Sequence, residues 1–325
     1  MATGGGQAVS CKLVNAGTLE LKDGDMIVSH YPWFTGLVVS ADMIMVVDSM
    51  SYKLRLYDRH DGKLLTTSDK LQSLPRDICI VEGRDVQVVV TLYNGQIEIL
   101  SVISMGQHVA IRRVKTFDLM RSFHRCDGVR VLQSTGNLVV SGLKLDKDTG
   151  KHWVCWGLVS LVDGHAGTIY KICKHTGIGW VYLATSHDNS TVYSSCMADN
   201  SVYAFVVNTG RQKFMYRHCD LKWPRGISVD KRGFIFVCNL VPSCIHQLGA
   251  EGEPVAIHRE AMPPRWPRAM YWEEQQDELY ITSDGSKEVW RFHPVWSDQQ
   301  DHKAPAILVE AERNQPVVEG RSTQT

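Results

Sequence analysis

Arginine recurs within one short phrase of this 325-residue chain. The phrase reads LPRDI from Leu74, WPRGI from Trp223 and WPRAM from Trp266, and a degenerate copy, RCDGV, begins at Arg125. A guanidinium group is a planar fork of donors that fits a carboxylate or a phosphate, so several of them at one place would form an anion site. The candidate ligand-binding residues are therefore Arg76, Arg125, Arg225 and Arg268.

The elements that carry these arginines are predicted to be strands. Helical periodicity is almost absent, and short β-branched runs such as MIMVVD, VQVVVTL and FIFVC alternate with turn pairs such as Asp61-Gly62 and Asn94-Gly95. The stretch GWVYLATSHDNSTVYSSCMADNSVYAFVVNTGRQKFMY contains four such strands and three turns. It has the composition of one complete blade of a β-propeller.

The spacing of the repeats predicts six blades. Candidate blade starts lie 40 to 53 residues apart, which is the spacing of propeller repeats, and they fall near Thr35, Pro75, Asp127, Trp180, Pro224 and Pro267. The predicted fold is all-β, a six-bladed propeller of four-stranded antiparallel blades over residues 11–297, between a flexible N-terminus (1–10) and a polar tail (298–325). Either residues 17–27 or the tail segment 306–309 would supply the last outer strand.

Propeller geometry would bring the starts of the inner strands, and the four arginines with them, to one end of the central channel. One hypothesis is a positive funnel for a phosphate or carboxylate. The other is that each arginine pairs with an acidic residue of its own blade, such as Asp77 or Asp127, and only solvates a rim. On the funnel hypothesis, replacing Arg225 and Arg268 by Glu abolishes partner binding and leaves the thermal midpoint nearly unchanged.

Two segments carry a resemblance to a known family. Residues 223–253 and 266–292 resemble NHL repeats, the six-bladed propeller at the C-terminus of tripartite-motif proteins, with Trp or Leu in place of the usual Asn before the Pro. The resemblance implies a non-catalytic module that recognises a protein or single-stranded RNA partner, with a link to substrate recognition in ubiquitin ligation. The sequence has no Cys-x2-Cys pair and no sustained heptads, so neither a RING nor B-boxes nor a coiled coil is expected, and the protein is expected to be a monomer.

Two further groups are candidates for ligand contact. A basic loop with interleaved aromatic residues could follow a nucleic-acid backbone; its candidates are Arg112, Arg113, Lys115 and Arg121. The favoured alternative is an outer strand plus connector, with Val114, Phe117, Leu119 and Phe123 in the core. Trp223 and Trp266 could form a stacking platform, although packing between blades is the favoured interpretation.

No catalytic residue, cofactor or metal is predicted. The sequence has no HExxH, G-x-S-x-G, P-loop or Rossmann motif, so a non-enzymatic role is favoured. The enzyme alternative is a calcium-dependent propeller hydrolase or lactonase with its metal in the central tunnel. Calcium takes six to eight oxygen ligands, whereas the inner-strand positions offer only Asp77 and Asp127 as carboxylates.

The charge balance and the cysteine content limit the cellular surroundings in which the protein is expected to work. Lys plus Arg and Asp plus Glu are both 35, so bulk charge would not hold the protein on nucleic acid or an anionic membrane. No run of eighteen apolar residues occurs, and the nine scattered cysteines are expected to be buried free thiols. A cytoplasmic protein without membrane association is predicted.

Overall fold

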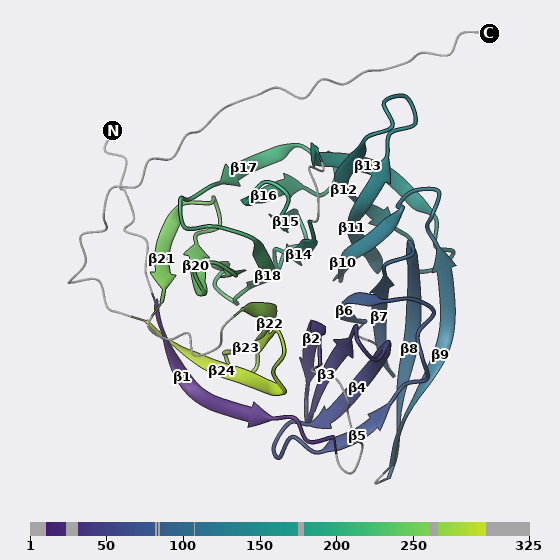
Figure 1. The fold of residues 1–325 in the computed structure, drawn as a ribbon, viewed down its shortest axis with the longest axis vertical. Coiled ribbons are helices and arrows are strands. Elements are labelled where there is room, and N and C mark those ends of the chain that lie inside the picture. Colours follow the sequence, from purple (N-terminus) through teal and green to yellow (C-terminus); the bar gives the residue numbers. More distant parts are fainter. Residues whose placement is uncertain are drawn as a thin grey trace.

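The computed structural model describes residues 11–23, 32–81, 83, 85–106, 108–174, 179–259 and 266–296. Six four-stranded antiparallel sheets form a ring around a central axis (Figure 1), which confirms the predicted six-bladed β-propeller. The expectations for residues 1–10, 298–325 and 306–309 lie outside the described residues. Within the described part of the chain, no helix is long and apolar enough to cross a membrane.

The first three blades run in sequence order from the inner to the outer strand. The first contains β2 (Phe34–Ser40), β3 (Met43–Asp48), β4 (Lys53–Asp58) and β5 (Leu64–Thr67). The second contains β6 (Pro75–Val81), β7 (Val86–Leu92), β8 (Gln96–Met105) and β9 (His108–Asp118). The third contains β10 (Arg125–Leu132), β11 (Asn137–Leu145), β12 (His152–Val159) and β13 (Ala166–Lys174).

The last three blades include the one that closes the ring. The fourth contains β14 (Val181–Thr185), β15 (Thr191–Cys196), β16 (Ser201–Val206) and β17 (Gln212–Tyr216). The fifth contains β18 (Pro224–Val229), β19 (Ile235–Asn239), β20 (Cys244–Leu248) and β21 (Pro254–His258). The sixth contains β22 (Pro267–Glu273), β23 (Glu278–Ser283), β24 (Glu288–Trp296) and, from the other end of the chain, β1 (Cys11–Glu20). The predicted blade starts lie within two residues of the observed ones.

The N-terminal strand β1 closes the ring, but over other residues than predicted. It pairs antiparallel with β24 from Cys11 opposite Trp296 to Glu20 opposite Glu288, so it begins six residues before the predicted segment 17–27 and ends within it. Cys11 and Leu13 are buried in the core of the sixth blade, which anchors the earlier half of the strand. Because β1 and β23 occupy both edges of β24, no edge of that strand is left for the tail.

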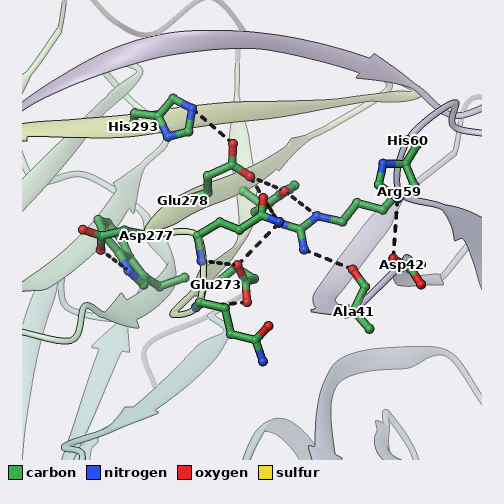
Figure 2. A network of polar contacts seen from close by, with 12 residues as sticks. Ala41, Asp42, Arg59, His60, Glu273, Asp277, Glu278 and His293 are labelled. Carbon is green, nitrogen blue, oxygen red and sulfur yellow. Dashed lines mark hydrogen bonds and ion pairs between the residues drawn. The ribbon is translucent and has the colours of Figure 1, made fainter.

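An arginine from the first blade ties it to the sixth (Figure 2). Arg59, which follows β4, is buried; its Nε donates to the Tyr280 hydroxyl at 2.9 Å and its Nη1 to the carbonyl of Ala41 at 3.1 Å. Its Nη2 donates to Gln276 at 2.9 Å and to Glu278 at 3.2 Å. We call this group the closure seam, because it lies between the two blades that meet where the ring closes.

Close contact between inner strands explains two glycines near the starts of these strands. Gly226 follows Arg225, and a Cβ there would lie 2.6 Å from the carbonyl oxygen of Arg268 on the next inner strand. The same holds for Gly36, where a Cβ would lie 2.8 Å from the backbone nitrogen of Ile78. The side chains of neighbouring blades pack in apolar layers outside this ring of inner strands.

Candidate functional site

Bulges at the starts of inner strands aim the repeated side chains. The pairing of β18 with β19 shifts between Pro224 and Ile227, and the pairing of β22 with β23 shifts between Pro267 and Met270. The pairings of β6 and β10 shift at the corresponding places. A bulge turns a side chain out of the regular alternation of a strand. The residues at these bulges are Arg76, Asp127, Arg225 and Arg268, so the third blade carries an aspartate where the others carry the arginine.

Three guanidinium groups converge on one indole ring. The Cζ atoms of Arg76 and Arg268 both lie 4.1 Å from the centre of the Trp180 ring, and that of Arg225 lies 5.1 Å away. Arg125 joins them through Tyr93, whose ring centre is 5.7 Å from Arg125 and equally far from Arg76. The structure thus brings all four predicted arginines together at one end of the channel.

A second tryptophan completes this group. Trp33 contacts Trp180 edge-to-face at 5.6 Å, and its ring centre lies 4.3 Å from the guanidinium of Arg268. Its Nε1 donates to Asp284 at 2.8 Å. We call the group the arginine cluster; its members are Arg76, Arg125, Arg225, Arg268, Asp127, Asp284, Trp33 and Trp180.

Each of the two aspartates pairs with two arginines. Asp127 bonds Arg125 of its own blade at 2.7 Å and Arg76 of the preceding blade at 3.4 Å. Asp284 repeats the pattern: Arg268 of its own blade lies at 2.5 Å and Arg225 of the preceding blade at 2.6 Å. The hypothesis of pairing within one blade is therefore correct for Arg125 and Arg268. Arg76 and Arg225 instead pair with an aspartate of the following blade.

The arginine cluster holds more positive charge than negative. Four guanidinium groups face two carboxylates, and none of the four arginines is more than 7% exposed. Among the described residues, Nε and Nη2 of Arg268 have no hydrogen-bond partner, and neither does Nε of Arg125 or Arg225. Buried donors without partners are costly, so an approaching anion would find both charge and free donors here.

Burial and like charges both act on Arg268. Burial is the main cause that brings the pKa of Arg268 down to about 10. Tyr182 and Asp284 oppose this shift, and the positive charges of Arg225 and Arg76 add to it. Burial also lowers the pKa of Arg76. Arg268 therefore stays charged at neutral pH, in surroundings that disfavour the charge.

The cluster is closed rather than an open funnel, which corrects the first hypothesis. The space between Arg76, Asp127, Trp180 and Tyr182 is too small to hold a water molecule. The premise that Arg225 and Arg268 are exposed rim charges is also wrong, so Glu at both positions is expected to lower the stability. Arg268 is fully buried against Asp284, so a glutamate there would place two carboxylates side by side without water.

Exposed apolar side chains surround the closed cluster. Of the fourteen large apolar side chains that are exposed among the described residues, seven lie at this end of the propeller. The ring of Tyr93 contacts Arg76, the N–H of Met50 shares the Asp48 carboxylate with that of Trp33, and the N–H of Val241 bonds the residue before Trp223. We call these seven the apolar rim: Met50, Tyr52, Tyr93, Met120, Trp223, Val241 and Trp266.

The two candidate stacking tryptophans belong to the rim and not to the core. Trp223 is 49% exposed and Trp266 is 53% exposed, so the favoured interpretation, packing between blades, is wrong. Both have a positive φ, 57° and 68°, in the left-handed region that side chains rarely adopt. This backbone conformation places the indoles outside the blade layers.

The basic loop forms an outer strand and a connector, as in the favoured alternative. Arg112, Arg113 and Lys115 lie on β9, at the outer edge of the second blade, away from the inner strands that carry the arginine cluster (Figure 1). Arg113 is held by Glu98 at 2.6 Å, and Lys115 donates to the carbonyl of Val162. Arg121 is exposed on the connector that follows.

The apolar residues of that segment divide between core and surface. Phe117, Leu119 and Phe123 are core residues, whereas Val114 is exposed on the outer strand. The expected core is therefore correct at three of four positions. Val114 differs because β9 is the last strand of its sheet and one of its faces is open to solvent.

The other end of the channel is open. The C-terminal ends of the inner strands line a cavity of about 520 Å³ there. His187 lies 3.3 Å from Glu274 at its edge, and Arg130 is held by Asp77 at 2.7 Å. No feature of the sequence pointed to His187 and Glu274, which lie in turns of different blades, whereas Asp77 and Arg130 lie on the inner strands β6 and β10.

The donor set in the tunnel does not suit calcium. Asp77 and Asp127 are not at equivalent positions: Asp127 faces the arginine cluster, and Asp77 bonds Arg130 and the N–H of Val129. Both carboxylates are already neutralised by arginine. Among the described residues, the groups of three or more close His, Cys, Asp or Glu side chains lie away from the inner strands.

The position of Trp33 and Trp180 in the sequence could have identified them as candidate site residues. Both precede the first residue of an inner strand, as Trp223 and Trp266 do. Asp284, by contrast, lies in a turn of the sixth blade, and no motif marks it as the partner of Arg225.

Comparisons with known proteins show the propeller fold. No protein-family model and no curated protein matches the chain. Its structure is similar to that of a luciferin-regenerating enzyme, with a TM-score of 0.60 and 16% identity over 87% of this chain and 95% of that one. A catalytically inactive virginiamycin B lyase from Staphylococcus aureus, solved with quinupristin, has a TM-score of 0.55 and 10% identity over 88% and 99%.

A third similar structure is a functionally unknown protein from Desulfotomaculum acetoxidans, with a TM-score of 0.55 and 14% identity over 75% of this chain and 73% of that one. Identities this low show a shared fold and leave function open. The NHL resemblance therefore rests on residues 223–253 and 266–292 alone. What the comparisons establish is that the chain is a six-bladed β-propeller.

Proposed function

We propose that this protein is a non-catalytic binding module that recognises an acidic segment of a protein partner at the arginine end of its channel. One observation carries the proposal: half of the large exposed apolar side chains among the described residues lie at the end of the channel that also holds a buried cluster with excess positive charge. Scattered exposed apolar residues need no explanation, but a gathered set marks an interaction site.

The chemistry of the apolar rim favours a protein partner. Trp, Tyr, Met and Arg are the residues enriched in the centres of protein interfaces, and Trp and Tyr dominate their hot spots. Trp223 and Trp266 are held outward by a left-handed backbone that costs conformational energy. Such a conformation at two equivalent positions suggests that the exposed indoles are used.

The arginine cluster sets the sign of the partner's charge. Its excess positive charge is buried, so salt screens it less than charges on the surface. Carboxylates of a partner seated on the rim, above Trp33 and Trp180, would be attracted by that field without entering the closed cluster. An acidic segment with apolar side chains therefore matches both the apolar rim and the arginine cluster.

Single-stranded RNA fits the same surface less well. The arginines that would contact phosphates are buried and paired with aspartates, and Met50, Met120 and Val241 offer no stacking face to a base. The NHL resemblance supports a recognition role in general. Substrate recognition for ubiquitin ligation is the part of the proposal that depends on that resemblance alone, and it requires first that the rim bind a protein segment.

The test is selection from a phage-displayed random peptide library, with the protein and the Trp223→Ser/Trp266→Ser variant as baits. We expect enrichment of acidic peptides with aromatic or aliphatic anchors by the unchanged protein. Each buried tryptophan hot spot contributes about 2 kcal/mol or more, so the double variant should bind the selected peptides at least about 100-fold more weakly.

A matched control separates the rim from exposed apolar surface in general. Val162 is 84% exposed on the turn between β12 and β13, so Val162→Ser should leave peptide binding unchanged. Absence of enriched peptides, together with salt-sensitive binding of a random single-stranded RNA pool, would overturn the protein-binding proposal in favour of RNA.

A further inference from the structure

Two thiols and a carboxylate meet between the third and fourth blades. Cys173 lies on β13, the outer strand of the third blade, and Cys196 ends β15 in the fourth. Their sulfur atoms are 3.3 Å apart. Asp199, in the turn after β15, places a carboxylate oxygen within 4.8 Å of both sulfurs. This group has no part in the arginine cluster or the apolar rim.

The carboxylate is held by one oxygen and leaves the other free. Oδ2 of Asp199 accepts a short hydrogen bond from the Tyr203 hydroxyl and lies 3.5 Å from the guanidinium of Arg217. Oδ1 is buried and has no hydrogen-bond partner among the described residues. Outer partners that orient one oxygen of a carboxylate while the other stays available are typical of a metal ligand.

We propose that Cys173, Cys196 and Asp199 bind a zinc ion that links the third and fourth blades. Thiolate sulfur and carboxylate oxygen are donors that zinc takes in tetrahedral sites, and a water molecule would complete the four ligands. Two sulfurs on one tetrahedral zinc, at about 2.3 Å each, are about 3.8 Å apart. The thiols would separate by about half an ångström from their present positions.

Zinc binds cysteine as the thiolate, so binding of the metal competes with binding of protons to the sulfurs. The contact with Cys173 and burial raise the pKa of Cys196 well above the usual range. Without metal the Cys196 thiol is therefore protonated at neutral pH. Cys173 is partly exposed, which gives an ion a route from solvent.

A disulfide between the same cysteines explains less of the geometry. It would account for two adjacent sulfurs, but it would leave the buried Oδ1 of the neighbouring Asp199 carboxylate without a partner among the described residues. It would also give no purpose to the contacts that Tyr203 and Arg217 make with Oδ2. Zinc uses all three donors.

A second group of similar composition serves as the control. His218, Cys219 and Asp220 are consecutive in the chain, and Asp220 is already bound to Arg259 at 2.6 Å. Nδ1 of His218 accepts the N–H of Asp220 at 3.1 Å, so it is also committed. Cys219→Ser therefore changes an exposed thiol without touching the proposed site.

The experiment is titration of the fully reduced protein with Zn²⁺, and with Co²⁺ as a spectroscopic substitute, followed by metal content, absorption and thermal midpoint. We expect one equivalent of zinc, a thiolate-to-cobalt charge-transfer band, and a thermal midpoint that falls when a chelator is added. Cys173→Ser and Asp199→Asn should each weaken zinc binding at least about tenfold, whereas Cys219→Ser should not.

Every outcome decides the proposal, because the variants are nearly isosteric and their folding is checked by the same thermal scans. Zinc binding that Cys219→Ser abolishes and Cys173→Ser does not would place the metal elsewhere and overturn it. So would failure of the reduced protein to bind zinc at all. Isolation of a stable Cys173–Cys196 disulfide, with no zinc binding after reduction, would replace the metal site by a redox pair.

Discussion

Buried arginine occurs at several places in this propeller, and the closure seam and the arginine cluster surround it differently. At the closure seam, one arginine faces two carboxylates: Arg59 lies 3.4 Å from Glu273 and 3.2 Å from Glu278 (Figure 2). All three of its guanidinium nitrogens donate hydrogen bonds. In the arginine cluster, four arginines share two carboxylates and Arg268 keeps two nitrogens without partners among the described residues.

The pKa values of the two arginines move in opposite directions. Burial acts to lower the pKa of Arg59, but the hydrogen bond with Tyr280 and the charge of Glu273 outweigh it, and the pKa rises. Burial brings the pKa of Arg268 down to about 10. In the closure seam, the arginine is fully paired within the protein. The arginine cluster instead retains excess positive charge and free hydrogen-bond donors that a binding partner could use.

The largest expected effect comes from removing charge at the seam. Arg59→Met leaves Glu273 and Glu278 buried without their cation, so we expect a loss of about 3–5 kcal/mol in the free energy of unfolding. The measurement is urea denaturation at neutral pH. Arg268→Met should cost about 1 kcal/mol or less, because Asp284 keeps Arg225 and repulsion among the arginines decreases. Equal losses in the two variants would refute the distinction.

A second prediction concerns the indole among the arginines. Trp180→Leu removes a ring that lies within 5.1 Å of three guanidinium groups. Cation–π contacts contribute about 0.5–2 kcal/mol each, so we expect a loss of about 2 kcal/mol that grows at low ionic strength. Trp153→Leu, at a ring whose cation contacts among the described residues are the exposed Lys171 and Lys174, is the control and should lose less.

A third prediction tests the excess charge directly. Millimolar inorganic tripolyphosphate should raise the thermal midpoint of the protein, since binding to the folded state alone stabilises it by about 1 kcal/mol at a few times the dissociation constant. The shift should shrink in Arg268→Met. An equal shift in both proteins would show that the anion binds elsewhere. It would contradict the idea that the arginine cluster, unlike the closure seam, has charge available for a ligand.

The smallest effect is a difference in pH dependence. In Arg268→Lys, the surroundings that lower the arginine pKa should lower that of the lysine below its unfolded value. The unfolded state then binds more protons in that alkaline window, so stability rises with pH there. In Arg59→Lys the surroundings raise the pKa, and stability should fall as pH passes the unfolded value. Unfolding free energies measured from pH 7 to pH 11 distinguish the two signs.

The blades could be predicted from local patterns, but the partners of the arginines could not. Strand alternation, turn pairs and the WPR phrase are local, so the six inner strands and the converging arginines followed from them. Asp284 pairs with Arg225 across 59 residues and two blades. Such a pair depends on how blades are rotated against one another, which no single segment encodes.

The four tryptophans that precede inner strands differ in where their side chains lie, although their positions in the blades are equivalent. Trp33, Trp180, Trp223 and Trp266 all precede an inner strand, yet two pack with the arginines and two stand in solvent. The outward pair has a positive φ and the inward pair does not. One backbone angle separates the two pairs, and both tryptophans of the WPR phrase have the outward, positive φ.

The pairing of β1 with β24 has a consequence for biosynthesis. The first strand of the propeller leaves the ribosome long before its partner, which is the last strand of the ring. At ordinary rates of translation it waits on the order of tens of seconds with an unpaired edge. A nascent chain stalled before the sixth blade is therefore an open ring with two sticky ends, and it is the form on which a chaperone or a protease would act first.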